Sequence, residues 1–375
     1  MAQQSTPHFA MAHATGDGTT VYTDDGRTFE VEGEVLDLGM DGNTVWTLTR
    51  GERNIDFHDL RVGVFRVYKN DKRKKTYKGN DDERYFSMAM RVKDGHVVVA
   101  GSMVAPFNDK GFQSCLFGEV DFERVFETNY ERKSLKRSNF RGFYVVKDGR
   151  LDVPIYDLDG TAYSVYYGVK DVDYYKGNIY ATGWGEREYT QTYGTKYYFV
   201  RRCPRVWRNG KEYVQQVENQ TGAAYCINVV NADGKRHILT SGHNRGLGCG
   251  WDGNKLIYNN PVGNFVVDEE AAIAKGSKIY RCCLVNRDHL CFIVQDGNSG
   301  SVEKVLDSVD YDTFFYDVVA DPANMDFYLL TRSYRGDDYE VWKLHCSGTT
   351  LKAPKKVFTF STNEAGSSPK LAISL

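Results

Sequence analysis

Arginine recurs in four long polar segments of this chain, each of which follows a short apolar run. Aromatic rings or a histidine accompany the arginines, and guanidiniums that converge beside stacking platforms suit an anionic or carbohydrate ligand. The alternative is ordinary surface, on which each arginine pairs with a neighbouring acid such as Glu52, Glu186 or Asp337. We predict a binding site that includes Arg50, Arg53, Trp184, Arg187, His243, Arg245, Trp251, Arg332, Tyr334 and Arg335.

The acidic residues form no complete catalytic or metal-binding motif. Residues 157–160 and 296–300 carry oxygen ligands for Ca²⁺ but lack the closing bidentate glutamate, so both are predicted to be turns. The eight histidines include no His-x-His or His-Glu-x-x-His group, and no Gly-x-Ser-x-Gly occurs. We expect no metal and no cofactor, and we assign no catalytic residue. A carboxylate pair for glycan cleavage stays open, with the candidates Asp307, Asp310, Asp312 and Asp317.

The predicted strands that lead into these residues repeat along the chain. Short apolar runs follow Gly, Asn or Asp turns, as hairpin strands do, and they recur at intervals of about 56 residues. We read the second strand of successive copies at residues 45–48, 97–101, 179–183, 238–242, 290–293 and 327–330. Strands that open a copy are expected at residues 85–89, 163–166, 225–229, 280–284 and 315–319.

The two ends of the chain complete the repeat. Residues 21–27 resemble the third and fourth strands of a copy that has no first strand, and residues 371–375 form an apolar strand with no copy of its own. Pairing these ends would close a ring and leave only short, protected sheet edges. We predict an all-β, seven-bladed β-propeller with a last blade shared between the N- and C-terminal strands. The alternative is a six-bladed ring.

The ring is predicted to be one domain over residues 1–375, with residues 1–8 flexible and a helical or loop insertion at residues 122–136. Aromatic residues make up 14% of the chain, and 36 glycines stand against 8 prolines, which favours strands and tight turns. The eight cysteines form no Cys-x-x-Cys pair, and those in apolar runs are expected to be buried thiols.

Charge and hydropathy exclude some partners. A net charge of −2 argues against binding nucleic acid or an anionic membrane through overall charge. No apolar run approaches the roughly 18 residues of a membrane span. The basic run at residues 72–75 lies at a hairpin turn and is expected to be a solvated outer strand rather than a nucleic-acid patch.

Two runs carry a resemblance to a known group of proteins. Residues 98–101 read Val-Val-Ala-Gly and residues 207–211 read Trp-Arg-Asn-Gly-Lys. They resemble the "YVAG … WKNG" repeats of uncharacterised β-propeller proteins from Bacteroidetes, and the resemblance covers most of the chain. It implies a propeller, commonly of the cell envelope, without established catalytic residues. The first residues lack the basic and apolar regions of a secretory signal, which favours a cytoplasmic or virion-associated protein unless the numbering begins after a cleaved signal.

The expected strand order separates two faces of the ring. Short turns lie on one face, whereas the loops after the second strands and the connections between blades lie on the other. We predict the binding site on this long-loop face, and a non-catalytic binding or assembly module for a protein or glycan ligand. The alternatives are a glycan-active hydrolase or lyase with acids near the central channel, and a structural component of a larger particle such as a phage virion.

Overall fold

The computed structural model describes most of the chain. The described residues are 7–16, 18–51, 56–57, 60–61, 63–78, 84–104, 112–120, 125–131, 155–156, 162–163, 167–193, 195–215, 222–244, 247–259, 266–285, 289–309, 313–333, 336, 338–362 and 366–374. Within these ranges the chain forms strands and turns, without a helix. None of the described segments forms a helix long and apolar enough to cross a membrane.

Six sheets are built from strands that follow one another along the chain, and we call them blades 1 to 6 in chain order. Blade 1 contains β4 (Glu34–Asp41), β5 (Thr44–Arg50), β8 (Phe65–Lys69) and β9 (Lys72–Tyr77). Blade 2 contains β10 (Arg84–Lys93), β11 (His96–Val104), β12 (Phe112–Glu119) and β13 (Val125–Glu131). Blade 3 contains β16 (Tyr167–Tyr175), β17 (Asn178–Tyr193), β18 (Thr195–Arg208) and β19 (Lys211–Gln215).

The second half of the chain continues the same pattern. Blade 4 contains β20 (Gly222–Ala232), β21 (Lys235–Asn244), β22 (Leu247–Asp252) and β23 (Lys255–Asn259). Blade 5 contains β24 (Val267–Lys275), β25 (Lys278–Val285), β26 (His289–Asp296) and β27 (Val302–Val309). Blade 6 contains β28 (Thr313–Asp321), β29 (Asp326–Ser333) and β30 (Tyr339–Ser347), and β30 pairs with both β31 (Thr350–Leu351) and β32 (Lys355–Phe360). Two short hairpins, β6 (Asp56–Phe57) with β7 (Leu60–Arg61) and β14 (Ile155–Tyr156) with β15 (Ala162–Tyr163), stand apart.

A further four-stranded sheet, the closing blade, joins the two ends of the chain. Its strands β1 (His8–Thr15), β2 (Gly18–Thr23) and β3 (Thr28–Glu32) are consecutive, and β33 (Ser367–Ser374) pairs with β1 on the inner side. The predicted shared blade is therefore confirmed. The predicted flexible segment is wrong at His8, which opposes Ser374 in this sheet, and residues 1–6 lie outside the described residues.

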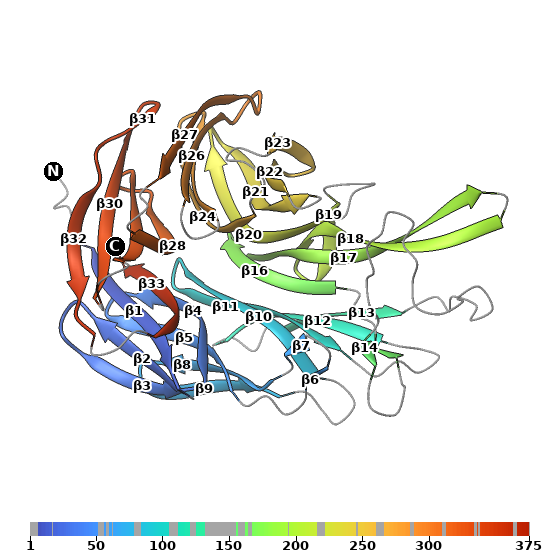
Figure 1. Cartoon of the computed structure of the whole chain (residues 1–375), viewed down its shortest axis with the longest axis horizontal. Helices are drawn as coiled ribbons and strands as arrows, with labels where there is room; N and C mark the ends of the chain where they lie inside the picture. Colours follow the sequence, from blue (N-terminus) through green and yellow to red (C-terminus); the bar gives the residue numbers. More distant parts are fainter. Residues whose placement is uncertain are drawn as a thin grey trace.

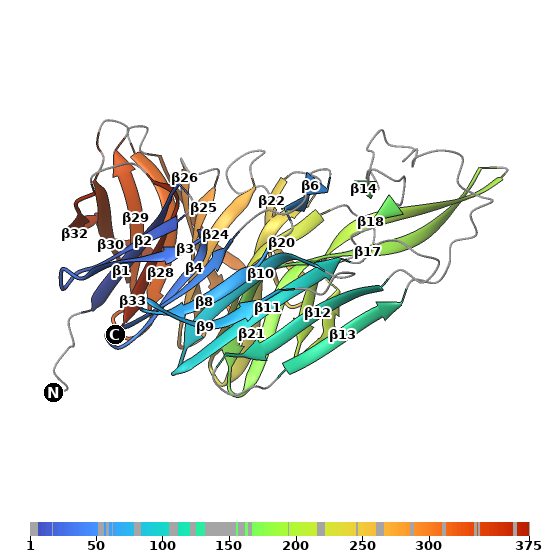
Figure 2. The same ribbon diagram turned by 90° about the horizontal axis from the view of Figure 1, so that it is seen from below.

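The seven sheets form a ring, and the predicted β-propeller fold is confirmed (Figure 1). The innermost strands contact one another in the cyclic order β33, β4, β10, β16, β20, β24 and β28, and β28 returns to β33. Figure 2 shows the ring from the side, with the β17–β18 hairpin projecting beyond the other strands. Closure through β33 leaves no inner strand without two neighbours.

Tight turns connect the strands where the sequence predicts them. Asn209 and Gly210, between β18 and β19, have φ of 48° and 78°. Both residues therefore lie in the left-handed region, as a two-residue type I′ hairpin turn requires. The side chain of Asn209 also accepts the Ile179 backbone N–H at 2.9 Å, which fixes this turn to β17.

Four predicted segments differ from the structure. Residues 280–284 and 290–293 lie in the second and third strands of blade 5 instead of the first and second, because β24 precedes them. Residues 125–131, within the predicted insertion, form the outer strand β13. The predicted opening strand at residues 163–166 is also displaced, because the inner strand of blade 3 begins at Tyr167.

The core is divided among the seams between neighbouring blades. Phe292 of blade 5 and Phe327 of blade 6 pack edge to face at 6.2 Å, and similar apolar clusters fill other seams. The six cysteines described, at 226, 249, 282, 283, 291 and 346, are buried thiols.

A charged pair lies inside the seam between blades 4 and 5. The Arg281 and Glu270 side chains are 0% exposed, and Arg281 Nη2 lies 2.9 Å from Glu270 Oε2. Tyr258 Oη donates to Glu270 Oε2 at 3.1 Å, and Arg281 Nη2 also donates to the Thr240 carbonyl at 2.9 Å. The pair is thus satisfied on both sides, as burial of charge requires.

Candidate functional site

The two predicted tryptophans lie in the interior. Trp251 is 0% exposed and packs with Ala224 and Cys249, so its prediction as a stacking platform on the surface is wrong. Trp184 is 7% exposed, and its indole fills the space that Gly168 leaves by lacking a side chain. Both rings contribute to the core instead of to the long-loop face.

Three other predicted site residues are held by contacts within the chain. Arg50 Nη2 lies 2.6 Å from Glu34 Oε2, so this arginine pairs with an acid, and Glu52 lies outside the described residues. Arg332 Nε donates to the Gly336 carbonyl at 2.8 Å, and its guanidinium lies 5.7 Å from the Tyr339 ring. The His243 ring stacks on Tyr225 with centroids 5.6 Å apart.

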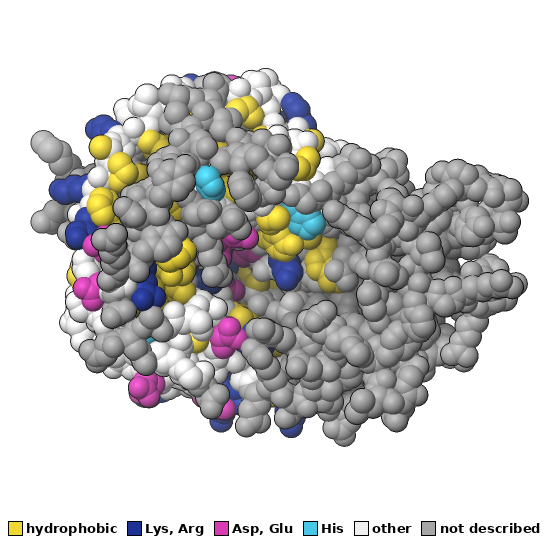
Figure 3. All heavy atoms as spheres, in the orientation of Figure 1, with side chains coloured by type: hydrophobic (Ala, Val, Ile, Leu, Met, Phe, Trp, Pro, Cys, Tyr) yellow, Lys and Arg dark blue, Asp and Glu magenta, His cyan; other side chains and the backbone are white. Residues whose placement is uncertain are grey.

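The other five predicted site residues have no described side chain. Arg53, Arg245, Tyr334 and Arg335 lie outside the described residues. Arg187 belongs to β17, and the structure describes its backbone only. Figure 3 shows one face of the ring, where acidic, basic and apolar side chains lie close together near the centre. Convergence of the arginines around the axis stays a prediction.

A pocket lies on the axis, where the inner strands end. Its volume is about 690 Å³, within the range of about 300 to 1,000 Å³ that ligand sites occupy. All seven inner strands line it, with residues that precede the turns between first and second strands. The pocket is therefore at the short-turn end of the channel, opposite to the face predicted from the sequence.

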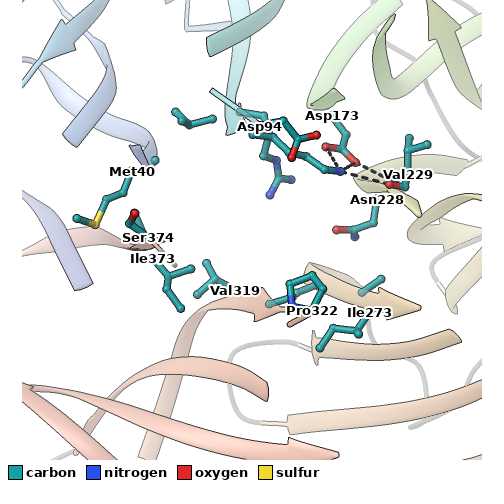
Figure 4. Close-up of a pocket in the computed structure, with 18 of the residues that line it drawn as sticks. Met40, Asp94, Asp173, Asn228, Val229, Ile273, Val319, Pro322, Ile373 and Ser374 are labelled. Atoms are coloured by element: carbon teal, nitrogen blue, oxygen red, sulfur yellow. Dashed lines mark hydrogen bonds and ion pairs between the residues drawn. The ribbon is translucent and has the colours of Figure 1, made fainter. Parts of the chain in front are cut away.

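The two walls of the pocket differ in chemistry (Figure 4). Strands β10, β16 and β20 contribute a polar wall that includes Arg91, Lys93, Asp173 and Asn228. Strands β4, β24, β28 and β33 contribute an apolar wall whose side chains are Met40, Ile273, Val319, Pro322 and Ile373. A ligand in this pocket would meet charge on one side and hydrocarbon on the other.

The charged groups of the polar wall are bound to one another. Lys93 Nζ lies 2.8 Å from Asp173 Oδ2 and donates to the Val229 carbonyl at 3.2 Å. Asp173 also accepts the backbone N–H groups of Val229 at 2.6 Å and Tyr174 at 2.8 Å. These bonds join blades 2, 3 and 4, and they leave Asp173 no lone pair free to act as a strong base.

Beside the pocket, further along the channel, the inner strands carry a layer of acids. Asp37, Asp171 and Asp317 are each the first paired residue after a bulge in their strand. Each carboxylate accepts a backbone N–H of the next blade at 2.8 Å, from Met90, Ile227 and Leu371 respectively. Repetition at equivalent positions indicates that these carboxylates hold neighbouring blades together.

Cations balance only part of this acidic layer. Arg91 Nη2 lies 3.2 Å from Asp171 Oδ2, and Lys370 pairs with Glu269. Burial raises the pKa of Asp37 to about 7 and the pKa of Asp317 to about 6, and it also raises the pKa of Asp171. Asp37 and Asp317 can therefore hold a proton near neutral pH.

Among the channel acids, only Asp317 was named as a candidate from the sequence. Lys93, Asp171 and Asp173 were missed, although a signal for them exists. Residues 91–93 read Arg-Val-Lys and residues 171–173 read Asp-Val-Asp, so charged side chains alternate with a valine in both runs. Charges at period two inside an apolar strand indicate a face that meets water, which in a propeller is the channel. Within the described ranges, no group of three His, Cys, Asp or Glu side chains is arranged to hold a metal ion.

Comparison with known proteins adds distant likenesses. No protein-family model matches the chain, and no curated protein does. Among solved structures, Saccharomyces cerevisiae Sqt1 is 9% identical at a TM-score of 0.47, with 96% of this chain and 83% of that chain covered. The β-propeller domain of the Trilobed protease from Pyrococcus furiosus is 13% identical at a TM-score of 0.44, covering 94% and 96%. The Pseudomonas aeruginosa periplasmic gluconolactonase is 11% identical at a TM-score of 0.34, covering 99% of both chains.

Likenesses this distant carry no argument about function. The resemblance to Bacteroidetes repeat proteins stays a prediction.

Proposed function

We propose that this propeller is a non-catalytic binding module that takes its ligand in the axial pocket. The observation that carries the proposal is the division of the pocket into a polar wall, with its charges already paired, and an apolar wall. Pockets of this kind orient a ligand by a few polar groups and retain it by apolar contact. A sugar or a short peptide segment presents both kinds of surface.

Paired charges favour binding over catalysis. A general base needs a free lone pair within reach of the substrate, and Asp173 uses its oxygens on Lys93 and on two backbone N–H groups. Lys93 is likewise engaged with Asp173 and with the Val229 carbonyl. These groups can still accept or donate weakly to a ligand, and their fixed positions reduce the ordering cost of binding.

The experiment fills the pocket without touching the charge pairs. Val319 lines the apolar wall and is partly exposed, so Val319→Trp should occupy the space that a ligand needs. Val357→Trp on the outer strand β32 is the matched control, because Val357 is 37% exposed and lies outside the pocket lining. Wild type and both variants are tested on a glycan array and on a peptide array.

We expect one class of ligand to bind wild type and Val357→Trp, and binding to be lost in Val319→Trp. Binding that persists in a folded Val319→Trp protein, or no specific binding by wild type on either array, would remove the proposal.

A glycan-active hydrolase is the second candidate, and the raised pKa values of Asp37 and Asp317 favour it. An acid that keeps its proton near neutral pH can protonate a leaving group. Asp37→Asn and Asp317→Asn would then abolish cleavage of a bound glycan without preventing its binding. Absence of any cleavage by wild type across the glycans that it binds would exclude this alternative.

A further inference from the structure

Two arginines and two tyrosines gather on the seam between blades 3 and 4, away from the residues that line the axial pocket. Tyr180 lies in β17, Arg208 ends β18, Tyr213 lies in β19 and Arg236 lies in β21. We call these four residues the arginine–tyrosine cluster. Each lies within four residues of a tight turn, so the cluster is on the short-turn face of the ring.

The rings hold both guanidiniums in place. The Arg208 guanidinium carbon lies 5.9 Å from the Tyr180 ring centroid and 5.7 Å from the Tyr213 centroid. The corresponding distances for Arg236 are 5.6 Å and 5.8 Å. The two rings meet edge to face, and cation–π contact at such distances restricts the arginine side chains. Both positive charges are therefore confined to one small area.

Neither charge has an acid partner within the described ranges of the chain. Arg208 donates from Nε and Nη2 to Asn178 Oδ1 at 3.0 Å and 2.9 Å, and Arg236 donates from Nη2 to Tyr213 Oη at 2.8 Å. Among the residues that the structure describes, no carboxylate forms an ion pair with either arginine, and nearby Glu212 pairs with Arg205. Arg208 Nη1 and Arg236 Nε and Nη1 thus keep donors for another molecule.

A buried hydroxyl lies at the same place. Tyr180 is 0% exposed, and its hydroxyl has no hydrogen-bond partner within the described part of the chain. Above it, Tyr213 is 43% exposed, which is unusual for a large ring. Two like charges and an unpaired hydroxyl thus lie together without a counter-ion among the described residues. An anion would neutralise the charges and accept hydrogen bonds from the free N–H groups.

We propose that the arginine–tyrosine cluster binds a phosphate or sulfate group carried by a ligand. The planar donor forks of two arginines suit the several oxygens of a tetrahedral oxyanion, and the exposed Tyr213 ring offers apolar contact to the group that carries it. Lys211 is exposed at the start of β19 and adds positive charge to the same area. The site is independent of the axial pocket and does not depend on the function proposed for it.

The first measurement uses the full chain and two probes, inorganic phosphate and inorganic sulfate, with acetate for comparison. We expect saturable binding of phosphate or sulfate by isothermal titration calorimetry, and the tighter of the two identifies the kind of ester that the natural ligand carries. In Arg208→Gln/Arg236→Gln, affinity should fall roughly tenfold or more, because charge-assisted hydrogen bonds to the anion are lost. The control Arg73→Gln/Lys74→Gln removes two exposed charges from β9 and should bind as wild type.

A second measurement needs no variant. Phenylglyoxal modifies accessible arginines, and mass spectrometry can follow each site in the wild-type protein. We expect phosphate or sulfate to slow modification of Arg208 and Arg236 while Arg73 reacts as before. The proposal is overturned by absence of protection at both arginines, by no saturable binding of either anion, by unchanged affinity in the folded double variant, or by an equal loss in the β9 control.

Discussion

Two seams of this ring hold opposite charges in contrasting surroundings. Between blades 4 and 5, Arg281 and Glu270 are fully enclosed, and the Tyr258 hydroxyl and the Thr240 carbonyl form hydrogen bonds with them. Between blades 2 and 3, the Arg91 and Asp171 side chains are 34% and 15% exposed and face the channel. The first pair cannot be relieved by water if one partner is lost, whereas the second can. The Arg281–Glu270 ion pair is therefore fixed in its seam, whereas the Arg91–Asp171 ion pair can rearrange.

The largest loss of stability is expected when one partner of the enclosed Arg281–Glu270 pair is removed. Arg281→Ala would leave Glu270 buried without its cation, at a cost of about 3–5 kcal/mol in the free energy of unfolding. Chemical denaturation monitored by tryptophan fluorescence would measure the loss. The double variant Glu270→Leu/Arg281→Met should recover most of it, because no charge is then left in the seam. A single variant as stable as wild type would mean that water reaches this seam.

A smaller loss is expected at the channel. Asp173→Ala removes the acceptor of the Val229 and Tyr174 N–H groups and the partner of Lys93. It should cost about 2 kcal/mol, because the Lys93 side chain is 33% exposed and can be solvated when its partner is lost. The same denaturation measurement gives the value. A loss as large as that of Arg281→Ala would show that the two seams do not differ in hydration.

A third seam, between blades 1 and 2, should make the stability of the protein depend on pH, because Asp37 accepts the Met90 N–H there. The unfolded chain releases the Asp37 proton near pH 3.8, whereas the folded protein keeps it up to a pKa of about 7. The folded state therefore binds more protons between these values, and its stability falls as pH rises through the window. Asp37→Asn cannot titrate, so relative to wild type it should gain stability between pH 4 and pH 8, by up to about 4 kcal/mol for this difference in pKa. Parallel stability profiles of the two proteins would contradict the raised pKa.

The smallest effect belongs to a pair on the outer surface. Lys356 Nζ lies 2.9 Å from Glu340 Oε1, and the two side chains are 49% and 28% exposed. Lys356→Ala should change the free energy of unfolding by less than about 0.5 kcal/mol, since water replaces most of the interaction. Thermal unfolding of both proteins at low and high salt is a sufficient check, and a salt-dependent loss above about 1 kcal/mol would be unexpected.

The features of the fold that the sequence predicts correctly are those with a signal in a few neighbouring residues. The Asn209-Gly210 turn and the unpaired apolar strand at the C-terminus both carry strong local signals, and both predictions agree with the structure. The strand order of blade 5 was missed because Asp268, Glu269 and Glu270 follow Val267 at the start of its inner strand, and such an acidic run looks like a loop. The strand tolerates two of these acids because each has a cation partner, Lys370 for Glu269 and Arg281 for Glu270.

The site was harder to predict than the fold. Trp251 has the residue type of a stacking platform, but burial is decided by blade packing that no local pattern reveals. Lys93 and Asp173 are 80 residues apart in sequence, so their pairing depends on the packing of blade 2 against blade 3. The arginine–tyrosine cluster likewise joins residues from two blades.

The closing blade has a consequence for folding during translation. Its strand β1 is synthesised before the strands of the six other blades, and its partner β33 is synthesised after them. The edge of β1 therefore stays unpaired, and able to capture a strand of another chain, until all six blades have been translated. Ribosome-bound chains that end before residue 367 should be cleaved by protease within β1, and released chains that contain β33 should resist. Chains truncated before β33 thus expose an open sheet edge.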